Sequence, residues 1–417
     1  MSRNREQWAQ KPNLPTTHYS DPLIYSDPDI FEEEKEKIFK KTWLLASHES
    51  ELPNPHDFRT YDHPAGPKLV IVRGEDMKIR TFLNVCPHRG NVLVYEPSGN
   101  SKNLVCIFHQ WAFNGKGDCV DIPREKEGYQ DRVCKKDVAL REVRTETAFG
   151  GFVWVNLDDN CVPLKEYIAG ALDYMLPELE TERLETMWYY QGTINTNWKL
   201  IHDTNSEFYH DYLHYHNRIT GMMDPKTGYW TRKLKTFANG HAQVGTMEAS
   251  YEQYQGGGHS KLGWPNLPAG WKLVDLYPCI TFNLRNSVLR IDTYIPVAPN
   301  KMRFEFRAMG LKNDTPEIRR QRQKDGAVIW SPFGRNLHED LIASSGQTMG
   351  MAKGSEKMYF LAAREEGAGC QDEVALRHYF TEWDKRMGRS HNDPMAKPAA
   401  AKAPAGTTAP ADAPVPA

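Results

Sequence analysis

Two short segments, CPHRG at residues 86–90 and CIFH at residues 106–109, determine the fold of the first half of this chain, because each contains possible metal ligands. Each segment places a cysteine and a histidine within three positions of each other, and each lies at the end of an apolar run typical of a β-strand. Turn residues come next in both cases, with Gly90 in the first. We therefore expect two loops, at the tips of adjacent hairpins, that hold one metal centre from both sides. The candidate ligands are Cys86, His88, Cys106 and His109.

This set of ligands suits two kinds of metal site. A tetrahedral zinc ion accepts two thiolates and two imidazoles, and so does a Rieske [2Fe–2S] cluster, in which two cysteines hold one iron and two histidines hold the other. Zinc sites usually take like ligands from one segment, as C-x₂₋₄-C and H-x₃₋₅-H. Here each loop supplies one ligand of each type. The spacing therefore favours the two-iron cluster over zinc.

The composition excludes several classes of protein. The chain has 417 residues, 40% of them hydrophobic, which is enough for more than one domain. It has 52 lysines and arginines against 54 aspartates and glutamates, and a net charge of −2 argues against a nucleic-acid-binding protein. Its seven cysteines are too few for a disulfide scaffold. Without a long apolar run or a secretory leader, we expect a soluble cytoplasmic protein that makes no membrane contact.

The pattern along the chain predicts an α+β protein in four parts. Residues 1–43 predict a helical segment that packs on the C-terminal domain. Short apolar runs separated by Gly, Pro and Asn make residues 44–165 an all-β module. Helix and strand signals mix over residues 166–395, and the Ala- and Pro-rich residues 396–417 predict a disordered tail. The strands predicted in the β module include residues 68–73, 80–85, 103–108 and 151–157.

Two elements of the C-terminal domain stand out. Apolar and charged residues alternate from Lys301 to Ala308, which predicts a half-buried strand entered through a hairpin turn at Pro299-Asn300. A closing helix is predicted from apolar residues at helical spacing. Its inner face comprises Leu376, Tyr379, Phe380, Trp383 and Met387.

A second candidate metal site lies in the segment NWKLIHDTNSEFYHDYLHYHNR, residues 197–218. His210 and His214 are four positions apart, so on a helix both imidazoles project from one face toward a single ion. A carboxylate from elsewhere would complete a 2-His-1-carboxylate triad, which leaves open positions on Fe(II) for oxygen chemistry. Two histidines at this spacing are also common on ordinary helices, but a cluster upstream favours a second redox site.

These segments together resemble those of a known family. CPHRG…CIFHQW is similar to the motif C-x-H-R-G…C-x-x-H-x-W of the Rieske non-haem iron oxygenases, except that Gln110 stands where these proteins more often have glycine. Asn197-Trp198-Lys199, Asp203 and Tyr209-His210 match the family's iron-ligand stretch. The chain looks like the large (α) subunit of the bacterial ring-hydroxylating dioxygenases. The resemblance implies a helix-grip catalytic domain with an antiparallel sheet, and a trimer of composition α3 or α3β3.

The resemblance assigns roles to individual residues. It makes His210 and His214 ligands of a mononuclear iron, although the family's usual spacing is longer and His216 is kept as the alternative. The segment FGRNLHEDLIASSGQ (333–347) is similar to the family's late acidic motif, so Asp340 is expected as the third ligand. Glu339 is the alternative to Asp340, and an ordinary acidic pair at a helix start is the plainer interpretation. Glu207 takes the place of the family's bridging aspartate, which hydrogen-bonds an iron-ligating histidine and a cluster histidine of the neighbouring subunit.

The resemblance also implies partners and a reaction. No G-x-G-x-x-G fingerprint is present, so electrons from NADH must come through a separate reductase, with or without a ferredoxin. A small β subunit is also expected. The chain would then be a terminal oxygenase that activates O2 at Fe(II) to hydroxylate a small organic acid or an aromatic compound. A Rieske electron carrier without mononuclear iron and a zinc-stabilised binding protein are the alternatives.

The substrate is the least determined feature. The family mostly hydroxylates aromatic rings, and Tyr212, Trp230, Trp264 and Phe282 are aromatic residues available for a pocket, although each is more typical of a core. The departures from the family pattern favour a non-aromatic substrate, such as a small alkanesulfonate (a methanesulfonate monooxygenase-like enzyme) or a quaternary amine. Arg218 and Arg285 are the candidates for binding an anionic substrate.

Overall fold

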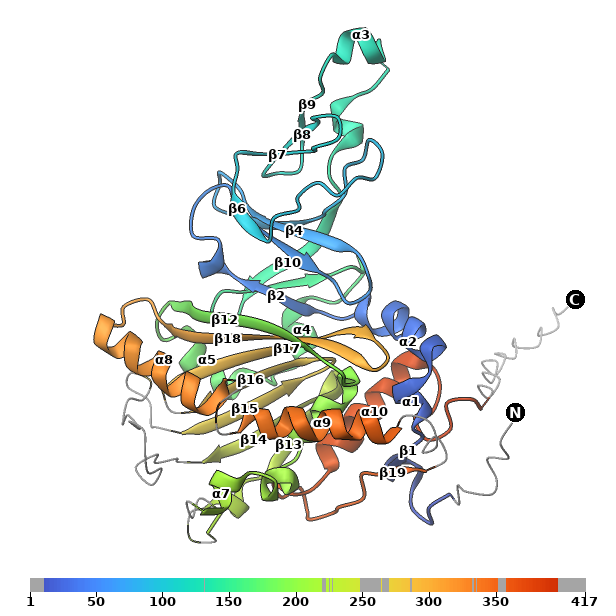
Figure 1. Cartoon of the computed structure of the whole chain (residues 1–417), viewed down its shortest axis with the longest axis vertical. Coiled ribbons are helices and arrows are strands. Elements are labelled where there is room, and N and C mark those ends of the chain that lie inside the picture. The colour runs from blue at the N-terminus through green and yellow to red at the C-terminus, as the bar shows by residue number, and fades with distance from the viewer. Residues whose placement is uncertain are drawn as a thin grey trace, which may run out of the picture.

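A computed structural model of the chain describes residues 11–396 apart from 131, 220–222, 225, 227, 248–263, 265–269, 286, 332–333, 335 and 352–357. The tail predicted to be disordered, 396–417, lies outside the described residues except for Ala396. Figure 1 shows a narrow upper part made mainly of strands and a broader lower part in which helices cover a large sheet. Among the described residues, no helix has the length and apolar character needed to cross a membrane.

The upper part, which we call the N-terminal β module, is built on a seven-stranded antiparallel sheet (Figure 1). The segment KLVIVR forms a strand over the predicted residues 68–73, and all of its residues but the first are buried. In spatial order the strands are β2 (Leu44–His48), β11 (Phe152–Asn156), β10 (Glu142–Ala148), β5 (Ile79–Leu83), β4 (Lys68–Arg73), β3 (Asp57–Asp62) and β6 (Ser98–Asn100).

A second, three-stranded sheet lies at the far end of this module (Figure 1). The run NLVCIF was expected to be a strand over residues 103–108, but the strand ends at Val105. It ends there because the chain turns at Cys106, whose N–H donates to the carbonyl of Trp111 at 2.9 Å. The strands are β7 (Asn103–Val105), β8 (Ala112–Asn114) and β9 (Cys119–Asp121), and the short helix α3 (Glu125–Tyr129) follows them.

The lower part contains a second seven-stranded antiparallel sheet, which we call the C-terminal sheet. The predicted turn at Pro299-Asn300 joins two of its three longest strands, β17 and β18. In spatial order the strands are β12 (Leu184–Ile194), β18 (Lys301–Leu311), β17 (Val288–Ala298), β16 (Ile280–Arg285), β15 (Trp271–Leu276), β14 (His241–Met247) and β13 (Leu234–Phe237).

The two faces of the C-terminal sheet have different neighbours. One face packs on the N-terminal β module, where the rings of Trp154 and Phe282 stack with their centroids 6.2 Å apart. This contact corrects the expectation that the strand from Lys301 to Ala308 is half-buried. Glu305 and Arg307 are buried as well, and the Arg307 Nε donates to Glu51 at 2.7 Å across the contact. Polar residues on this face therefore mark an interface between the two sheets.

Helices cover the opposite face of the C-terminal sheet. The closing helix buries the apolar face that its spacing predicted, and Thr315 caps the helix that begins at Pro316 by accepting a hydrogen bond from the N–H of Ile318. A two-stranded sheet of β1 (Tyr19–Ser20) and β19 (Phe360–Leu361) ties the N-terminal segment to this layer. The helices α4 (Leu164–Ile168) and α5 (Leu176–Glu180) pack instead with Trp154 and Phe282, on the side of the N-terminal β module. The other helices of the lower part are α6 (His202–Asn205), α7 (Tyr215–Ile219), α8 (Pro316–Trp330), α9 (Leu337–Met351) and α10 (Val374–Met387).

The N-terminal segment packs against the same helical layer. It forms α1 (Leu23–Ser26) and α2 (Pro28–Glu34), and Asp27 caps α2 by accepting hydrogen bonds from two backbone N–H groups. The carboxylate of Glu34 is fully buried and accepts a hydrogen bond from Lys199 at 2.8 Å. Because a buried carboxylate is costly unless it is paired, this contact fixes the segment against the lower part of the molecule.

Candidate iron–sulfur and mononuclear iron sites

The two loops with C-x-H and C-x-x-H spacing share one backbone design. In each, the cysteine carbonyl accepts a hydrogen bond from the N–H four residues later, that of Gly90 in one loop and Gln110 in the other, at 2.9 Å. Both of these residues have a left-handed backbone, with φ of +72° and +62°. The position of Gln110 thus has the conformation that glycine adopts most easily, which explains why glycine is common there. The two cysteine side chains are buried side by side.

The histidines complete this first site. The rings of His88 and His109 lie 4.5 Å apart, and His88 stacks on Trp111 with an angle of 3° between the rings. The outer Nε2 of His88 lies 3.2 Å from the hydroxyl of Tyr129. Its Nδ1 is buried and has no hydrogen-bond partner among the described residues. Burial also raises the pKa of the Cys86 thiol to about 11, so a bound cation is needed to keep it ionised at neutral pH. Two buried thiols and an unpaired ring nitrogen fit a Rieske cluster.

The second site is built differently from the prediction. The spacing of His210 and His214 suggested one continuous helix, but the structure has a 3₁₀ turn over Tyr209–Tyr212, and α7 begins only at Tyr215. The N–H of His214 donates to the carbonyl of Asp211, three residues back, at 3.1 Å. The tighter turn still brings the two imidazoles together, with ring centroids 5.4 Å apart.

Asp340 reaches this pair from the first turn of α9. Its Oδ1 lies 3.3 Å from the Nε2 of His214 and 3.9 Å from the Nε2 of His210. This Oδ1 is buried and accepts no hydrogen bond from the described residues. Two imidazole nitrogens and an unpaired carboxylate oxygen, contributed by segments more than a hundred residues apart, therefore point at one small volume. This donor set fits the 2-His-1-carboxylate site of Fe(II).

Two glutamates hold the outer nitrogens of the same histidines. The Nδ1 of His210 lies 3.0 Å from Glu207, and the Nδ1 of His214 lies 2.7 Å from Glu339. Carboxylates in such positions fix the orientation of a metal-ligating histidine. Glu339 therefore lies behind His214, which favours Asp340 over Glu339 as the third ligand. The side chain of His216, the alternative to His214, lies outside the described part of the structure.

The charges of these groups are strongly perturbed. Burial lowers the pKa of His210, but the carboxylates of Glu207, Asp211 and Asp340 outweigh it and raise that pKa to about 10. Burial, together with the charge on His210, lowers the pKa of His214 to about 2. Burial raises the pKa of Asp340 to about 7. An incoming cation must therefore displace a proton from His210 at neutral pH.

Sequence reasoning missed Asp211. Its side chain is buried, and its Oδ1 lies 3.8 Å from the Nε2 of His210 and 3.5 Å from that of His214. His210, Asp211 and His214 form a group close enough to hold a metal ion. The available signal was an acidic residue directly after a candidate ligand, but nothing in the sequence shows on which side of the turn that residue lies.

The residues proposed for substrate contact have mixed outcomes. Trp264 and Phe282 are core residues, and Tyr212 is exposed and stacks on Trp230. Arg218 is exposed on α7. Arg285 is buried beside the candidate iron ligands and lines the pocket that they form. The aromatic residues that line this pocket, Phe208, Trp271 and Trp330, were not singled out from the sequence.

A chain that can hold a Rieske cluster in one module and a 2-His-1-carboxylate iron under a gripping helical layer has the architecture of the Rieske non-haem iron oxygenases. Comparison with known families agrees. The Rieske [2Fe–2S] domain family matches residues 42–144, and the catalytic domain of the ring-hydroxylating alpha subunits matches residues 178–389, about half of the chain. The chain belongs to the family of ring-hydroxylating oxygenase alpha subunits.

Individual relatives cover almost the whole chain. The alpha subunit of the methanesulfonate monooxygenase hydroxylase of Methylosulfonomonas methylovora is 48% identical over 404 residues, 94% of this chain and 97% of the relative. The alpha subunit of a 2-aminobenzenesulfonate 2,3-dioxygenase of an Alcaligenes species is 40% identical over 396 residues, 94% of this chain and 99% of the relative. A solved naphthalene 1,2-dioxygenase with bound indole shares the fold, with a TM-score of 0.76 at 22% identity over 91% of this chain and 94% of that one.

The family settles the class of function. The protein is the terminal oxygenase component of a multicomponent system, and it uses a Rieske [2Fe–2S] cluster and a mononuclear Fe(II). As in its family, its electrons come from NADH through a partner reductase. This excludes the electron carrier without mononuclear iron and the zinc-stabilised binding protein as descriptions of the chain.

Proposed function

We propose that this protein hydroxylates a small sulfonate, with an alkanesulfonate such as methanesulfonate as the main candidate. One observation carries the proposal: Arg285, buried to 2% exposure, lines the same pocket as His210, His214 and Asp340. A buried cation beside the reaction site favours an anionic substrate. The two relatives that match nearly the whole chain are named for sulfonates, one aliphatic and one aromatic. The pocket is small, which favours the aliphatic one.

The products follow from simple chemistry. Inserting one oxygen atom into a C–H bond beside a sulfonate gives an α-hydroxysulfonate, which is the bisulfite adduct of an aldehyde. The second oxygen atom leaves as water, with two electrons from NADH. We propose that His210, His214 and Asp340 hold the Fe(II), which supplies O2 activation, and that Glu207 and Glu339 orient the two imidazoles. Cys86, His88, Cys106 and His109 are the proposed ligands of the cluster.

We further propose that electrons reach the iron from the cluster of a neighbouring subunit, in an α3 or α3β3 assembly. The cluster loops lie at the end of the N-terminal β module away from the C-terminal sheet, whereas α7 lies at the opposite end of the molecule (Figure 1). The route within one chain would therefore cross both sheets. The surface around the cluster loops is apolar and exposed, as expected for a docking surface. Its residues are Val85, Val105, Ile107 and Phe108, with exposures of 41, 41, 65 and 57%.

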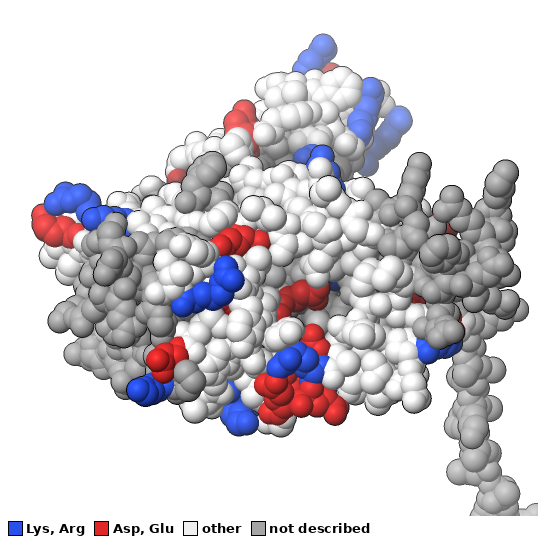
Figure 2. Space-filling view, turned by 60° about the horizontal axis from the view of Figure 1, so that its bottom comes forward, with Lys and Arg blue, Asp and Glu red and all other residues white. Residues whose placement is uncertain are grey.

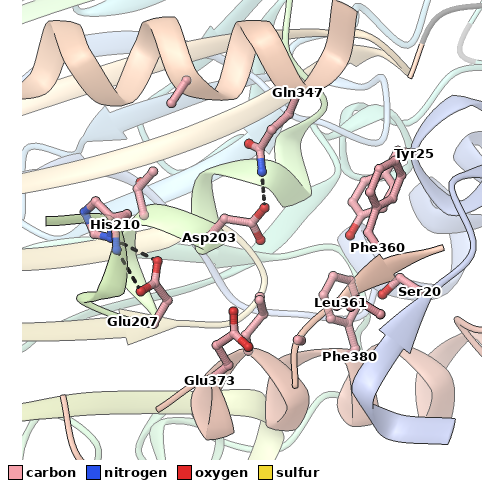
Figure 3. A pocket seen from close by; sticks show the side chains of 14 residues that line it. Ser20, Tyr25, Asp203, Glu207, His210, Gln347, Phe360, Leu361, Glu373 and Phe380 are labelled. Atoms are coloured by element: carbon pink, nitrogen blue, oxygen red, sulfur yellow. Dashed lines mark hydrogen bonds and ion pairs between the residues drawn. The ribbon is translucent and has the colours of Figure 1, made fainter. Parts of the chain in front are cut away.

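A pocket beside Glu207 offers a place where such a neighbour can dock. It has a volume of about 730 Å³, open mouth included, and Figure 3 shows Glu207 held against His210, with Asp203 and Glu373 nearby. Burial raises the pKa of Asp203 to about 7, and Gln347 donates a hydrogen bond to it at 2.6 Å. Figure 2 shows acidic side chains near the middle of the lower face of the molecule, with Lys or Arg side chains beside them. This environment supports the proposal that Glu207 bridges His210 to a cluster histidine of the neighbouring subunit.

The substrate is tested with the full chain, reductase and NADH. We expect methanesulfonate to stimulate O2 uptake and to yield formaldehyde and sulfite in equal amounts. Naphthalene, an aromatic carboxylic acid and a quaternary amine serve as competing substrates. Stimulation by one of these and none by any alkanesulfonate or by 2-aminobenzenesulfonate would refute the proposal.

The route of electrons is tested with hybrid assemblies. A chain with Cys106→Ser cannot hold the cluster, and a chain with Asp340→Ala lacks an iron ligand, so neither is expected to turn over alone. Coexpressed from two tagged copies and purified on both tags, the mixture is expected to regain part of the wild-type activity, since one intact cluster can face one intact iron. An inactive mixture of correct size would refute transfer between subunits.

Three further expectations remain proposals. The first is a division into domains at 44–165 and 166–395, with residues 1–43 as a segment on the catalytic domain, which the ranges of the two family matches support. The second is a small β subunit beside the reductase, with or without a ferredoxin. The third is the cytoplasmic location.

A further inference from the structure

The pocket beside the candidate iron ligands has one wall made of strands. It has a volume of about 320 Å³, mouth included. In the register of the C-terminal sheet, Arg290 lies opposite Asn283, two residues before Arg285 on the same strand, so these side chains share the face turned to the iron ligands. The pocket is lined by Thr204, Asn205, Phe208, His210, Asp211, His214, Trp271, Leu273, Asn283, Arg285, Arg290, Trp330, Asn336 and Asp340.

Two buried guanidinium groups on this wall, those of Arg285 and Arg290, both pack against the indole ring of Trp330. Arg285 and Arg290 are 2% and 3% exposed, and their guanidinium carbons lie 4.7 and 4.0 Å from the ring centre of Trp330. The Nη2 of Arg290 donates to Asp292 at 2.5 Å. Two buried cations therefore lie side by side on this wall, and burying such charges is costly unless they are paired. The other carboxylates of the pocket, Asp211 and Asp340, lie against the two histidines and also interact with the charge of Arg285.

Some donors on this wall have no partner. The Nε and Nη1 of Arg290 and the Nε1 of Trp330 are buried and find no acceptor in the part of the chain that the structure describes. Buried N–H groups are paired in the great majority of cases, because an unpaired one loses its bonds to water without replacement. Three such atoms, on two residues that line one pocket, indicate a site built for a ligand rich in acceptor oxygens.

We propose that Arg290 and Trp330, with Arg285 beside them, bind the sulfonate group of the substrate. This inference rests on the proposed function and adds the residues that select the substrate. A sulfonate carries one negative charge over three acceptor oxygens, so it supplies acceptors for the unpaired N–H groups of Arg290 and Trp330 together with a charge opposite to that of Arg290. In methanesulfonate the reacting carbon is bonded directly to sulfur. An anion bound on the arginine wall would therefore have its C–H bonds on the side of His210 and Asp340.

The competing explanation is structural. In that case Arg290 only packs on Trp330 and pairs with Asp292, and its substitution changes folding and not substrate choice. Trp330→Phe separates the two explanations, because it keeps an aromatic ring against both guanidinium groups and removes a single N–H donor. Arg290→Lys is a second separate test, since it retains the charge near Asp292 and removes the planar set of donors.

The experiment measures the binding of methanesulfonate to the reduced, iron-loaded holoenzyme by calorimetry, beside KM and kcat from formaldehyde release. We expect Arg290→Gln to weaken binding about 100-fold, and Arg290→Lys and Trp330→Phe about tenfold, with the loss in KM rather than kcat. Dimethyl sulfone, a neutral analogue, should gain relative to methanesulfonate in Arg290→Gln. Arg319→Gln on α8, where Arg319 pairs with Glu185, is the matched control and should bind methanesulfonate as the wild type does.

The outcomes separate this inference from the proposed function. Unchanged affinity for methanesulfonate in Arg290→Lys and Trp330→Phe, with the visible spectrum of the cluster and the melting temperature preserved, would overturn the inference and leave a sulfonate oxygenase intact. A wild type that oxidises no sulfonate in the substrate screen would overturn the proposed function instead. If Arg290→Gln fails to fold, Arg290→Lys and Trp330→Phe decide the matter.

Discussion

The two metal sites of this chain contrast in how the chain builds them. The cluster site takes its four candidate ligands from two loops within 24 residues, Cys86 to His109, on a protruding module where exposed apolar residues such as Ile107 and Phe108 surround them. The mononuclear site takes its proposed ligands, His210, His214 and Asp340, from segments more than a hundred residues apart. An electron-transfer site must be reached by partner proteins, whereas an oxygen-activating site must exclude water. The position of each site in the molecule, and the distance along the chain between its proposed ligands, therefore suit the function of that site.

Removing one ligand from each site is the strongest test of this contrast. We expect Asp340→Ala to abolish oxygenation while the visible spectrum of the cluster is unchanged, because the N-terminal β module holds its own ligands. Iron per chain should fall from about three to about two. Cys106→Ser should remove the colour and the activity together. The two sites would not be independent if Asp340→Ala also bleached the cluster in a protein of normal melting temperature.

A smaller effect is expected from the carboxylates behind the histidines. Glu207 and Glu339 each hold the Nδ1 of one histidine, but only Glu207 lines the pocket proposed for the neighbouring cluster. Glu207→Gln should slow reoxidation of the reduced cluster by O2 in the presence of substrate about 100-fold. Glu339→Gln is the matched control and should lower iron affinity without a comparable loss of rate. Equal rates in the two variants, measured by stopped flow at saturating iron, would remove the bridging role of Glu207.

Asp211 gives a third test, within the iron site itself. Its Oδ1 is nearly as close to the two histidine nitrogens as that of Asp340. We expect Asp211→Asn to lower the affinity for Fe(II) about tenfold, since a charge facing the ion is removed while the shape is kept. The measurement is a competition titration of the apo-iron protein with a chelator. Affinity equal to the wild type would show that Asp211 does not contribute to metal binding.

The same contrast explains what the sequence could predict. The four proposed cluster ligands lie in short local motifs, and strand β4 and the closing helix α10 follow directly from hydrophobic spacing. His210 and His214 were found from spacing, but the 3₁₀ turn between them was not, because helix and turn share that spacing. Asp211, Arg290 and Trp330 could not be found, since their meeting depends on the register of the C-terminal sheet and the end of α8. Glu305 and Arg307 look like exposed strand residues in the sequence. They are buried because the C-terminal sheet packs on the N-terminal β module at their position, and a sequence pattern does not show that contact.

The smallest expected effect concerns the backbone of the cluster loops. Gly90 and Gln110 occupy equivalent left-handed positions, and a Cβ added at Gly90 would meet no atom within 4 Å. Gly90→Ala therefore introduces only backbone strain, and we expect a loss of about 1 kcal/mol in the free energy of unfolding. Gln110→Gly relieves the same strain and should gain somewhat less than about 1 kcal/mol, because glycine also adds freedom to the unfolded chain. The check is the temperature at which the cluster bleaches, with opposite signs expected for the two variants. Shifts of the same sign would mean that the two loops are not equivalent, and that the hydrogen bond from the Gln110 side chain to the Ile107 carbonyl contributes more than the backbone conformation.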